Sequence, residues 1–318
     1  MITMTGLTKQ YGDRLAVDDL TVTIRPGMVT GFLGPNGAGK STTMRMIVGL
    51  DRPTAGTALL DGRPYAALRR PLRHVGALLD SATAHPARRA KDHLRMVAAS
   101  NGIEKDRVGR VLEQVGLSEV ASRRVGGFSL GMSQRLGIAT ALLGDPPILL
   151  LDEPVNGLDP DGVRWIRDLM RSLAAEGRTV LVSSHLMSEM QHTADHLIVI
   201  GRGRLIADAP LQEVLDSASL NVARARTPET ASLASALRAA GCDVEQSPDG
   251  DLLITGARLP EIGDLAHRQQ IPLHELTMQA PTLEEAYLRL TGAAVEYSAD
   301  HASQSDQAAG QRRKADRI

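Results

Sequence analysis

The sequence of 318 residues contains 36 Lys and Arg against 37 Asp and Glu, for a formal net charge of -1. This length suffices for one large domain and a smaller one, and the balanced charge provides no chain-wide attraction to nucleic acid or membrane. The single cysteine, Cys242, excludes an internal disulfide, so we expect a reducing, cytoplasmic environment. The amino-terminal segment lacks the apolar core of a secretory signal, and no run approaches the ~18 apolar residues of a membrane helix. We therefore expect any membrane-spanning part to belong to another chain.

Residues 1–215 alternate short aliphatic runs with helical patterns. Five runs are predicted as strands: Leu20–Ile24, Met28–Leu33, Ile148–Leu151, Thr179–Ser183 and His196–Ile200. Helical periodicity lies between them, for example at Val163–Ala175 and Leu186–Thr193. Strands separated by helices predict an α/β domain with a mainly parallel sheet.

The strand signal weakens between about Arg63 and Arg124. Two helices are predicted there, at Lys91–Ser100 and Arg107–Val115, and each is followed by a glycine-containing end signal. We therefore predict a helical insert within the sheet domain, at about residues 63–145.

A different pattern begins after Asp216. It predicts, in order, strand Leu220–Ala225, helix Glu229–Ala240, a hairpin of Asp243–Gln246 and Leu252–Thr255, helix Glu261–Gln269, strand Pro272–Met278 and helix Leu283–Thr291. The β-α-β-β-α-β order predicts a small, ferredoxin-like α+β domain at residues 216–294. Residues 295–318 are polar and aperiodic, and we predict that they are disordered.

A glycine-rich loop follows the predicted strand Met28–Leu33 and opens a helix. It consists of Gly34, Pro35, Asn36, Gly37, Ala38, Gly39, Lys40, Ser41 and Thr42. This spacing is that of the GxxxxGK[ST] phosphate-binding loop, whose glycines let backbone amides point at phosphate oxygens next to a helix amino terminus. Lys40 is expected to reach the β and γ phosphates of ATP, and Ser41 to ligate Mg²⁺. Chance is a poor explanation for this lysine, because only five of the basic residues are Lys.

The aliphatic run Ile148–Leu151 ends in Asp152 and Glu153. Walker-type sites place an aspartate here to hold Mg²⁺, and the adjacent glutamate can polarise the attacking water. His185 also follows a predicted strand, and ligands bind at the carboxyl ends of strands in open α/β sheets. Each residue alone suits a solvated loop equally well. Together with the phosphate-binding loop, they predict catalytic roles for Glu153 and His185 and a metal-binding role for Asp152.

With these motifs, roughly residues 1–215 resemble the ATP-binding-cassette (ABC) ATPases, a family of P-loop NTPases. The segment that is similar to the family's signature motif consists of Phe128, Ser129, Leu130, Gly131 and Met132, with Gln134 and Arg135 after it. The commonest family form is LSGGQ, so Leu130 and Met132 depart from it. The resemblance implies that Ser129 and Gly131 meet the γ-phosphate of ATP bound to a partner chain.

Other residues match the family in the same order along the chain. Tyr11 resembles the aromatic residue that stacks on adenine, Asn156–Asp159 resembles the D-loop, and His185 resembles the switch histidine. Asp80 stands where the family's Q-loop glutamine is expected. Either Asp80 takes over the contact of that glutamine with Mg²⁺ or water, or the loop is used differently.

The resemblance also implies partners. In this family, two cassettes close head-to-tail around ATP, and this chain carries one set of motifs, so we expect an ATP-dependent homodimer. The segments VGALLD, SLGM, EPVNGLDP and PTLEEAYLRLTG are similar to those of export ATPases of the daunorubicin-resistance type. This implies export of a drug, antibiotic or other small hydrophobic compound through a separate permease. We expect the chain at the cytoplasmic face of the cell membrane.

Two further observations bear on this interpretation. Residues 63–124 contain 13 Lys and Arg against 6 Asp and Glu. This basic segment is either the side that faces the permease and anionic lipid headgroups or an ordinary solvated surface. The alternative function is a non-transport ABC ATPase, acting as a regulatory or nucleic-acid-associated motor. A DNA-repair or chromosome-organising motor would require a long coiled coil or a DNA-binding insertion, and the sequence indicates neither, so no nucleic-acid partner is expected. A purely regulatory module could lack the chemistry of hydrolysis, but Glu153 and His185 are both present.

Overall fold

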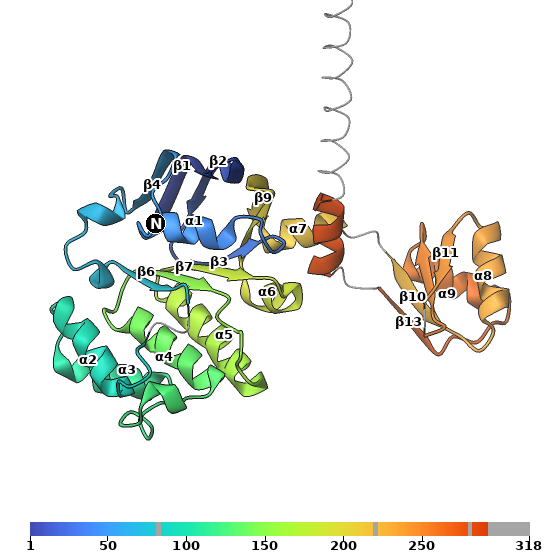
Figure 1. The fold of residues 1–318 in the computed structure, drawn as a ribbon. Coiled ribbons are helices and arrows are strands. Elements are labelled where there is room, and N and C mark those ends of the chain that lie inside the picture. The colour runs from blue at the N-terminus through green and yellow to red at the C-terminus, as the bar shows by residue number, and fades with distance from the viewer. Residues whose placement is uncertain (81–83, 219–221, 248, 279–281, 292–318) are drawn as a thin grey trace, which may run out of the picture. The chain divides into compact units, whose positions relative to one another are not determined.

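The computed structural model describes residues 1–80, 84–218, 222–247, 249–278 and 282–291. Their contacts divide into two compact units, one formed by residues 1–211 with 290 and 291, and the other by residues 212–289 (Figure 1). The expected boundary at residue 215 lies slightly beyond this division. The segment predicted to be disordered, 295–318, lies outside the described residues. Among the described helices, none has the length and apolarity that crossing a bilayer requires.

The larger unit is built on a six-stranded sheet in the order β5-β6-β7-β3-β8-β9. The strands are β3 (Met28–Leu33), β5 (Val75–Leu78), β6 (Ile148–Asp152), β7 (Thr179–Ser184), β8 (His196–Gly201) and β9 (Arg204–Pro210). The first five in spatial order are parallel, and only β9 pairs antiparallel, with β8. All six residues of β7 are buried, as expected for a parallel sheet with helices on both faces. The predicted mainly parallel α/β fold is confirmed.

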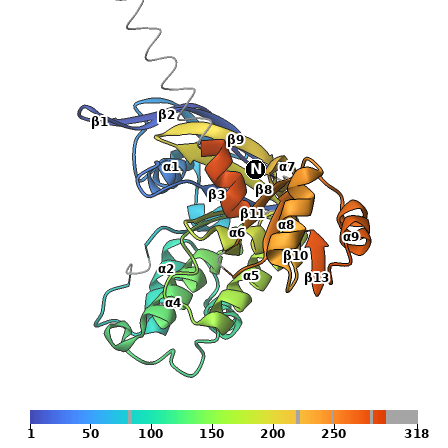
Figure 2. The same ribbon diagram turned by 90° about the vertical axis from the view of Figure 1, so that its right-hand side faces the viewer.

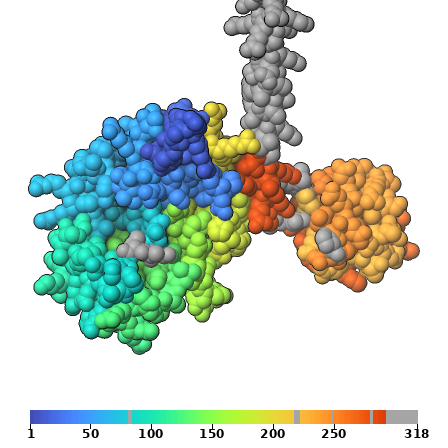
Figure 3. Space-filling model, in the orientation of Figure 1, coloured from blue at the N-terminus to red at the C-terminus, as the bar shows by residue number. Residues whose placement is uncertain are grey.

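Helices cover the two faces of this sheet. The helices of this unit are α1 (Lys40–Ile47), α2 (Ala90–Ser100), α3 (Lys105–Gln114), α4 (Leu130–Leu142), α5 (Pro160–Ala175) and α6 (Met187–Thr193). Of these, α2 and α3 pack on α4. Figures 1 and 2 show α1 on one side of the sheet and α4, α5 and α6 on the other. Figure 3 shows the surface of this unit, coloured from blue to yellow.

A second, antiparallel sheet in the order β2-β1-β4 packs over α1. It consists of β1 (Ile2–Tyr11), β2 (Arg14–Ile24) and β4 (Ala55–Leu60). Ile2 of β1, Phe32 of β3 and Met44 of α1 are all fully buried in one core. Only Leu20–Ile24 of this sheet was predicted from the sequence, because threonines and register shifts between β1 and β2 interrupt the alternation.

The predicted helical insert at residues 63–145 requires a correction. Val75–Leu78 forms β5, which pairs in parallel with β6 and therefore belongs to the central sheet. A four-residue apolar run is too short to show a period, and periodicity alone does not separate such a strand from a helix. Within residues 63–145, the first α-helix is α2, which begins at Ala90. The helices α2, α3 and α4 pack against one another.

The smaller unit contains an antiparallel sheet in the order β11-β12-β10-β13. Its elements, in chain order, are α7 (Leu211–Ala218), β10 (Ala223–Arg226), α8 (Thr230–Ala239), β11 (Asp243–Gln246), β12 (Leu252–Thr255), α9 (Leu259–Arg268) and β13 (Glu275–Met278). Residues 283–291 are helical. From β10 to β13, the β-α-β-β-α-β order is the one predicted. Leu233, Leu237, Ile254 and Ile262 lie at the centre of its core.

A buried carboxylate connects two strands of this smaller sheet. The Asp251 side chain is only 3% exposed and accepts hydrogen bonds from the guanidinium groups of Arg224 and Arg226. The bonds from Arg226 and then Arg224 lower the pKa of the Asp251 carboxyl to about 2. Folding therefore favours the ionised form of this group, which makes the stability of the smaller unit dependent on pH.

We expect Asp251→Asn to lower the melting temperature of the smaller unit at neutral pH. The unfolded Asp251 protonates near its ordinary pKa of 3.8, whereas the folded one protonates near 2. The stabilisation by the carboxylate is thus complete above about pH 3.8 and is lost as the pH falls toward 2. Calorimetry of the full chain should show that the melting temperatures of wild type and variant approach each other as the pH falls from about 3.8 toward 2. Asp264→Asn, on the exposed side of α9, is the control. A difference in melting temperature between wild type and Asp251→Asn that is the same at all pH values would contradict the prediction.

Candidate functional site

The glycine-rich loop lies between the end of β3 and the start of α1, at the centre of the larger unit. Gly39 caps α1 with a φ of 107°, a conformation that favours glycine. A Cβ atom on Gly39 would lie 2.5 Å from the carbonyl oxygen of Ala16, and one on Gly34 would lie 2.5 Å from that of Ile200. The loop therefore fits between β2 and β8 only because these two positions have no side chain.

Lys40 is the first residue of α1, and it is 7% exposed. Its Nζ donates hydrogen bonds to the carbonyl oxygens of Gly34, at 2.6 Å, and Pro35, at 3.2 Å. Burial lowers the pKa of the Lys40 ammonium, although the carboxylates of Glu153 and Asp152 oppose this shift. A desolvated cation at a helix amino terminus is suited to an anionic ligand such as phosphate.

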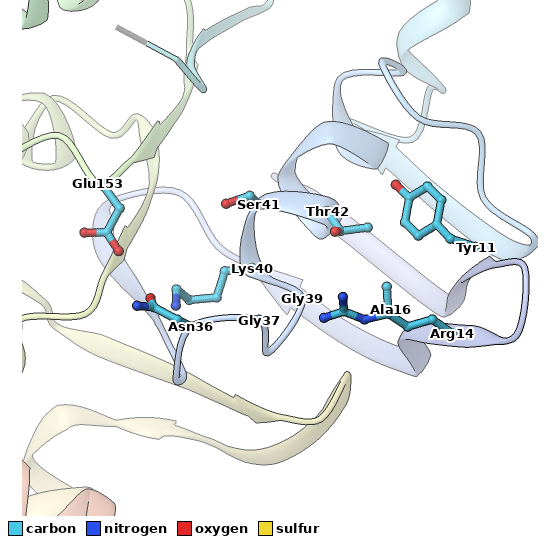
Figure 4. Close-up of a pocket in the computed structure, with 10 residues that line it drawn as sticks. All are labelled: Tyr11, Arg14, Ala16, Asn36, Gly37, Gly39, Lys40, Ser41, Thr42 and Glu153. Carbon is cyan, nitrogen blue, oxygen red and sulfur yellow. The ribbon is translucent and has the colours of Figure 1, made fainter.

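A cavity of about 450 Å³ opens above this loop (Figure 4). It is lined by Tyr11, Arg14, Ala16, Asn36, Gly37, Gly39, Lys40, Ser41, Thr42 and Glu153. Its volume is in the range of small-molecule sites. The remaining predicted loop residues, Gly34, Pro35 and Ala38, form the loop without lining the cavity. Arg14 and Ala16 were not predicted as site residues, because the part of β2 on which they lie was not predicted as a strand. The signal that could have indicated Arg14 is a basic residue close after the aromatic Tyr11.

Tyr11 lies at the end of β1 and is 46% exposed. Its hydroxyl donates to the Asp51 carboxylate at 2.8 Å, and the Lys9 ammonium lies 4.8 Å from the ring centroid. Burial and the neighbouring Asp51 raise the pKa of the Tyr11 phenol, which keeps it a donor. The hydroxyl bond fixes the ring at the mouth of the cavity, and an exposed ring is suited to stacking on a nucleotide base.

The carboxyl ends of β6 and β7 bring the predicted acidic residues and the histidine together. His185 Nδ1 lies 2.8 Å from Glu153 Oε2. The Ser183 hydroxyl donates to the Asp152 carboxylate and accepts from the backbone amide of Glu153 at 3.0 Å. Glu153 itself has a φ of 49°, in the left-handed region. Figure 4 shows its carboxylate across the cavity from the glycine-rich loop. Sequence reasoning did not single out Ser183.

The donor set at this site fits Mg²⁺. The Ser41 hydroxyl lines the cavity, and Asp152 ends β6. Within the described ranges, no three His, Cys, Asp or Glu side chains form a metal-binding group of their own. Mg²⁺ prefers oxygen ligands and commonly takes only one or two from protein, with phosphates and water completing the shell. Asp80 directly precedes the undescribed residues 81–83 and is not among the residues that line the cavity.

The predicted signature residues do not line the cavity of their own chain. Ser129 caps α4, where its hydroxyl accepts from the amide of Met132 at 3.2 Å, and Leu130 is 61% exposed. Asp159 caps α5 in the same way, through the amide of Gly162 at 2.9 Å. The D-loop lies against the signature segment, because a Cβ on Gly131 would be 2.9 Å from the carbonyl oxygen of Gly157.

Comparison with known proteins links both units to described families. The model of the family described as ABC transporter matches residues 17–156, and a domain of unknown function matches residues 221–284. An uncharacterized ABC transporter ATP-binding protein of Bacillus subtilis (strain 168) is 36% identical over 300 residues, which are 92% of this chain and 96% of that protein. The bacitracin transport ATP-binding protein of Bacillus licheniformis is 42% identical over 217 residues, covering 67% and 71%.

Among solved structures, the chain is similar to a dimeric ATP-binding cassette in a post-hydrolysis state bound to ADP and Pi. The TM-score is 0.62 at 25% sequence identity, and the match covers 66% of this chain and 99% of that chain. The covered share of this chain corresponds to about the length of the larger unit.

We expect Lys40→Ala to abolish detectable ATP binding, because the buried ammonium is the only lysine among the residues that line the cavity. Equilibrium binding of a fluorescent ATP analogue measures this directly. Lys105→Ala, on α3, removes a lysine that does not line this cavity and should bind as wild type does. Wild-type affinity in Lys40→Ala would show that the phosphates are held elsewhere.

Proposed function

Since the chain belongs to the ATP-binding proteins of ABC transporters, we propose that it hydrolyses ATP to drive export of a drug, antibiotic or other small hydrophobic compound through a separate permease. The observation that carries this proposal is the cavity that Lys40 and Glu153 line from different elements. His185 lies 2.8 Å from the Glu153 carboxylate without lining the cavity. The relative in Bacillus licheniformis, a bacitracin transport ATP-binding protein, supports an antibiotic as the class of cargo.

In the proposed complex, ATP lies along the cavity with its base at Tyr11 and its phosphates at Lys40. The backbone amides of the loop and the amino terminus of α1 hold the β and γ phosphates. Ser41 and Asp152 hold Mg²⁺, which neutralises phosphate charge when bound. Ser183, which donates to Asp152, fixes the orientation of that carboxylate.

Hydrolysis then requires a base near the γ-phosphate, and Glu153 supplies it. Its carboxylate accepts a proton from the attacking water. His185 Nδ1 lies 2.8 Å from that carboxylate and orients it. His185 is also proposed to contact the γ-phosphate. Asp80, which stands in the place of the family's glutamine, is proposed to contact Mg²⁺ or the attacking water from the end of β5.

A second copy of the chain completes the site. The signature residues Ser129–Met132 lie outside their own cavity, and the exposed Leu130 marks this surface. We infer that they close on the ATP of the other copy, with Asp159 at the same interface. The dimeric cassette bound to ADP and Pi supports a pair of this kind. The basic segment 63–124 is proposed to face the permease and the anionic headgroups of the cytoplasmic leaflet.

We expect Glu153→Gln to bind ATP but to hydrolyse it about 10²–10⁴-fold more slowly, because the amide cannot accept the proton. With hydrolysis blocked, the closed dimer persists, so light scattering should show a monomer with ADP and a dimer with ATP. Ser129→Arg added to this variant should prevent dimerisation by placing bulk and charge at the closing surface. A Glu153→Gln chain that is saturated with ATP and remains monomeric with the permease present would contradict the shared site.

Coupling to export is tested with a membrane protein encoded beside this chain. We expect the purified complex in vesicles to hydrolyse ATP faster when a transported compound is added, and to accumulate that compound only with ATP. The same complex carrying Glu153→Gln is the control and should do neither. ATP hydrolysis that is unaffected by the permease and by a panel of hydrophobic compounds would instead favour a non-transport function.

A further inference from the structure

We propose that α4 holds the loop after Glu153 at two points, through Gln134 and Leu130, and that Gln134 is a positioning residue for the catalytic carboxylate. The inference rests on the proposed role of Glu153 in hydrolysis. It adds a link within one chain between its own catalytic residue and the signature segment that is proposed to serve the second copy.

The first point is a pair of hydrogen bonds from a buried side chain. Gln134 lies on α4 and is 4% exposed. Its Nε2 donates to the carbonyl oxygen of Glu153 at 3.2 Å and to that of Pro154 at 3.0 Å. An amide nitrogen has two hydrogens, so a single side chain satisfies both carbonyls. Loss of this donor would leave two backbone acceptors without the partner on which their position depends.

These bonds matter because Glu153 has an unfavourable backbone conformation. Its φ of 49° lies in the left-handed region, which costs energy for a residue with a side chain. The surrounding structure must therefore fix it from both sides. The Ser183 hydroxyl accepts from its amide at 3.0 Å, and Gln134 donates to its carbonyl oxygen. Together they set the direction in which the carboxylate leaves the backbone toward His185.

The second point is a close fit between Leu130 and Gly157. A Cβ on Gly157 would lie 2.3 Å from Leu130 Cγ and 2.4 Å from Cδ2, and its φ is 76°. Leucine, in a position where glycine is commonest in the family, thus occupies the space that a side chain at 157 would need. The loop from Glu153 to Gly157 is therefore attached to α4 at its beginning and at its end.

The consequence is a mechanical link between two functions of α4. The amino end of α4 carries Ser129 and Gly131, and one turn further along the helix Gln134 contacts the backbone of Glu153. When the signature segment closes on a second copy, any shift of α4 is transmitted to the carboxylate of its own site. Hydrolysis would then be fast only in the closed dimer. Such a link requires measured coupling and not proximity alone.

Gln134→Met tests the first point, because it keeps the length of the side chain and removes the donors. We expect kcat to fall about 10- to 100-fold, part of the ~10²–10⁴-fold contribution of a general base, while KM stays within about threefold of wild type. Gln134→Asn retains the amide on a shorter side chain, so its kcat should fall less than that of Gln134→Met. Thr140→Val, which removes a hydroxyl from the same helix away from Glu153, is the matched control and should retain wild-type kcat.

Trp165 provides a separate readout of folding. It is the only tryptophan in the sequence, and the Arg135 guanidinium of α4 lies 4.5 Å from its ring centroid on α5. We expect its emission and the melting transition of Gln134→Met to match wild type, so that the loss in kcat reflects position alone. Wild-type kcat in a folded Gln134→Met, or an equal loss in Thr140→Val, would overturn the proposal. Absence of turnover in wild type would instead refute the proposed function.

A double-mutant cycle tests the second point. Gly157→Ala should lower kcat at least fivefold more in the presence of Leu130 than in the Leu130→Ala background. The reason is that Leu130→Ala removes the Cγ and Cδ2 atoms that a new side chain at 157 would meet. The strain from a φ of 76° remains in both backgrounds and cancels in the comparison. Independent effects of the two substitutions would overturn the contact between the signature segment and the D-loop.

Discussion

The close approach of the glycine-rich loop to two neighbouring backbones is the constraint on which the site depends. Gly34 faces the carbonyl oxygen of Ile200, and Gly39 faces that of Ala16, each at a separation that excludes a side chain. The loop is therefore enclosed between β2 and β8, and α1 must start at Lys40. This start places the amino terminus of α1, the Lys40 ammonium and the Ser41 hydroxyl around one cavity.

Charge burial follows from the same constraint. Lys40 loses most of its hydration, which lowers its pKa, and its hydrogens are directed to the loop carbonyls of Gly34 and Pro35. The carboxylates of Asp152 and Glu153, at the carboxyl end of β6, act on this ammonium. The site thus combines a desolvated cation with two carboxylates, an arrangement that suits the complex of an anionic nucleotide with a divalent cation. Neither the nucleotide alone nor the divalent cation alone would balance the charges of the ammonium and the two carboxylates.

The sequence predicts the parts of this site that are local in the chain. The loop from Gly34 to Thr42, the acidic pair after β6 and His185 after β7 each carry their signal within a few residues. Apart from Leu20–Ile24, the antiparallel sheet was missed, and with it Arg14 and Ala16, because its strands are rich in threonine and irregular in register. The strand β5 was missed because four apolar residues show no period. The contacts of Gln134 depend on residues 19 and 20 positions away, which no local pattern encodes.

The cavity draws its lining from two different sheets. Tyr11, Arg14 and Ala16 come from the antiparallel sheet, whereas the loop and Glu153 follow strands of the central sheet. In the proposed complex, recognition of the base is thereby separated from the chemistry at the phosphates, since each is encoded by its own layer of the fold. Substitutions in β1 and β2 would then change the contacts with the base while Glu153 and His185 keep their geometry. In evolution, nucleotide preference and catalytic rate are thus free to change independently.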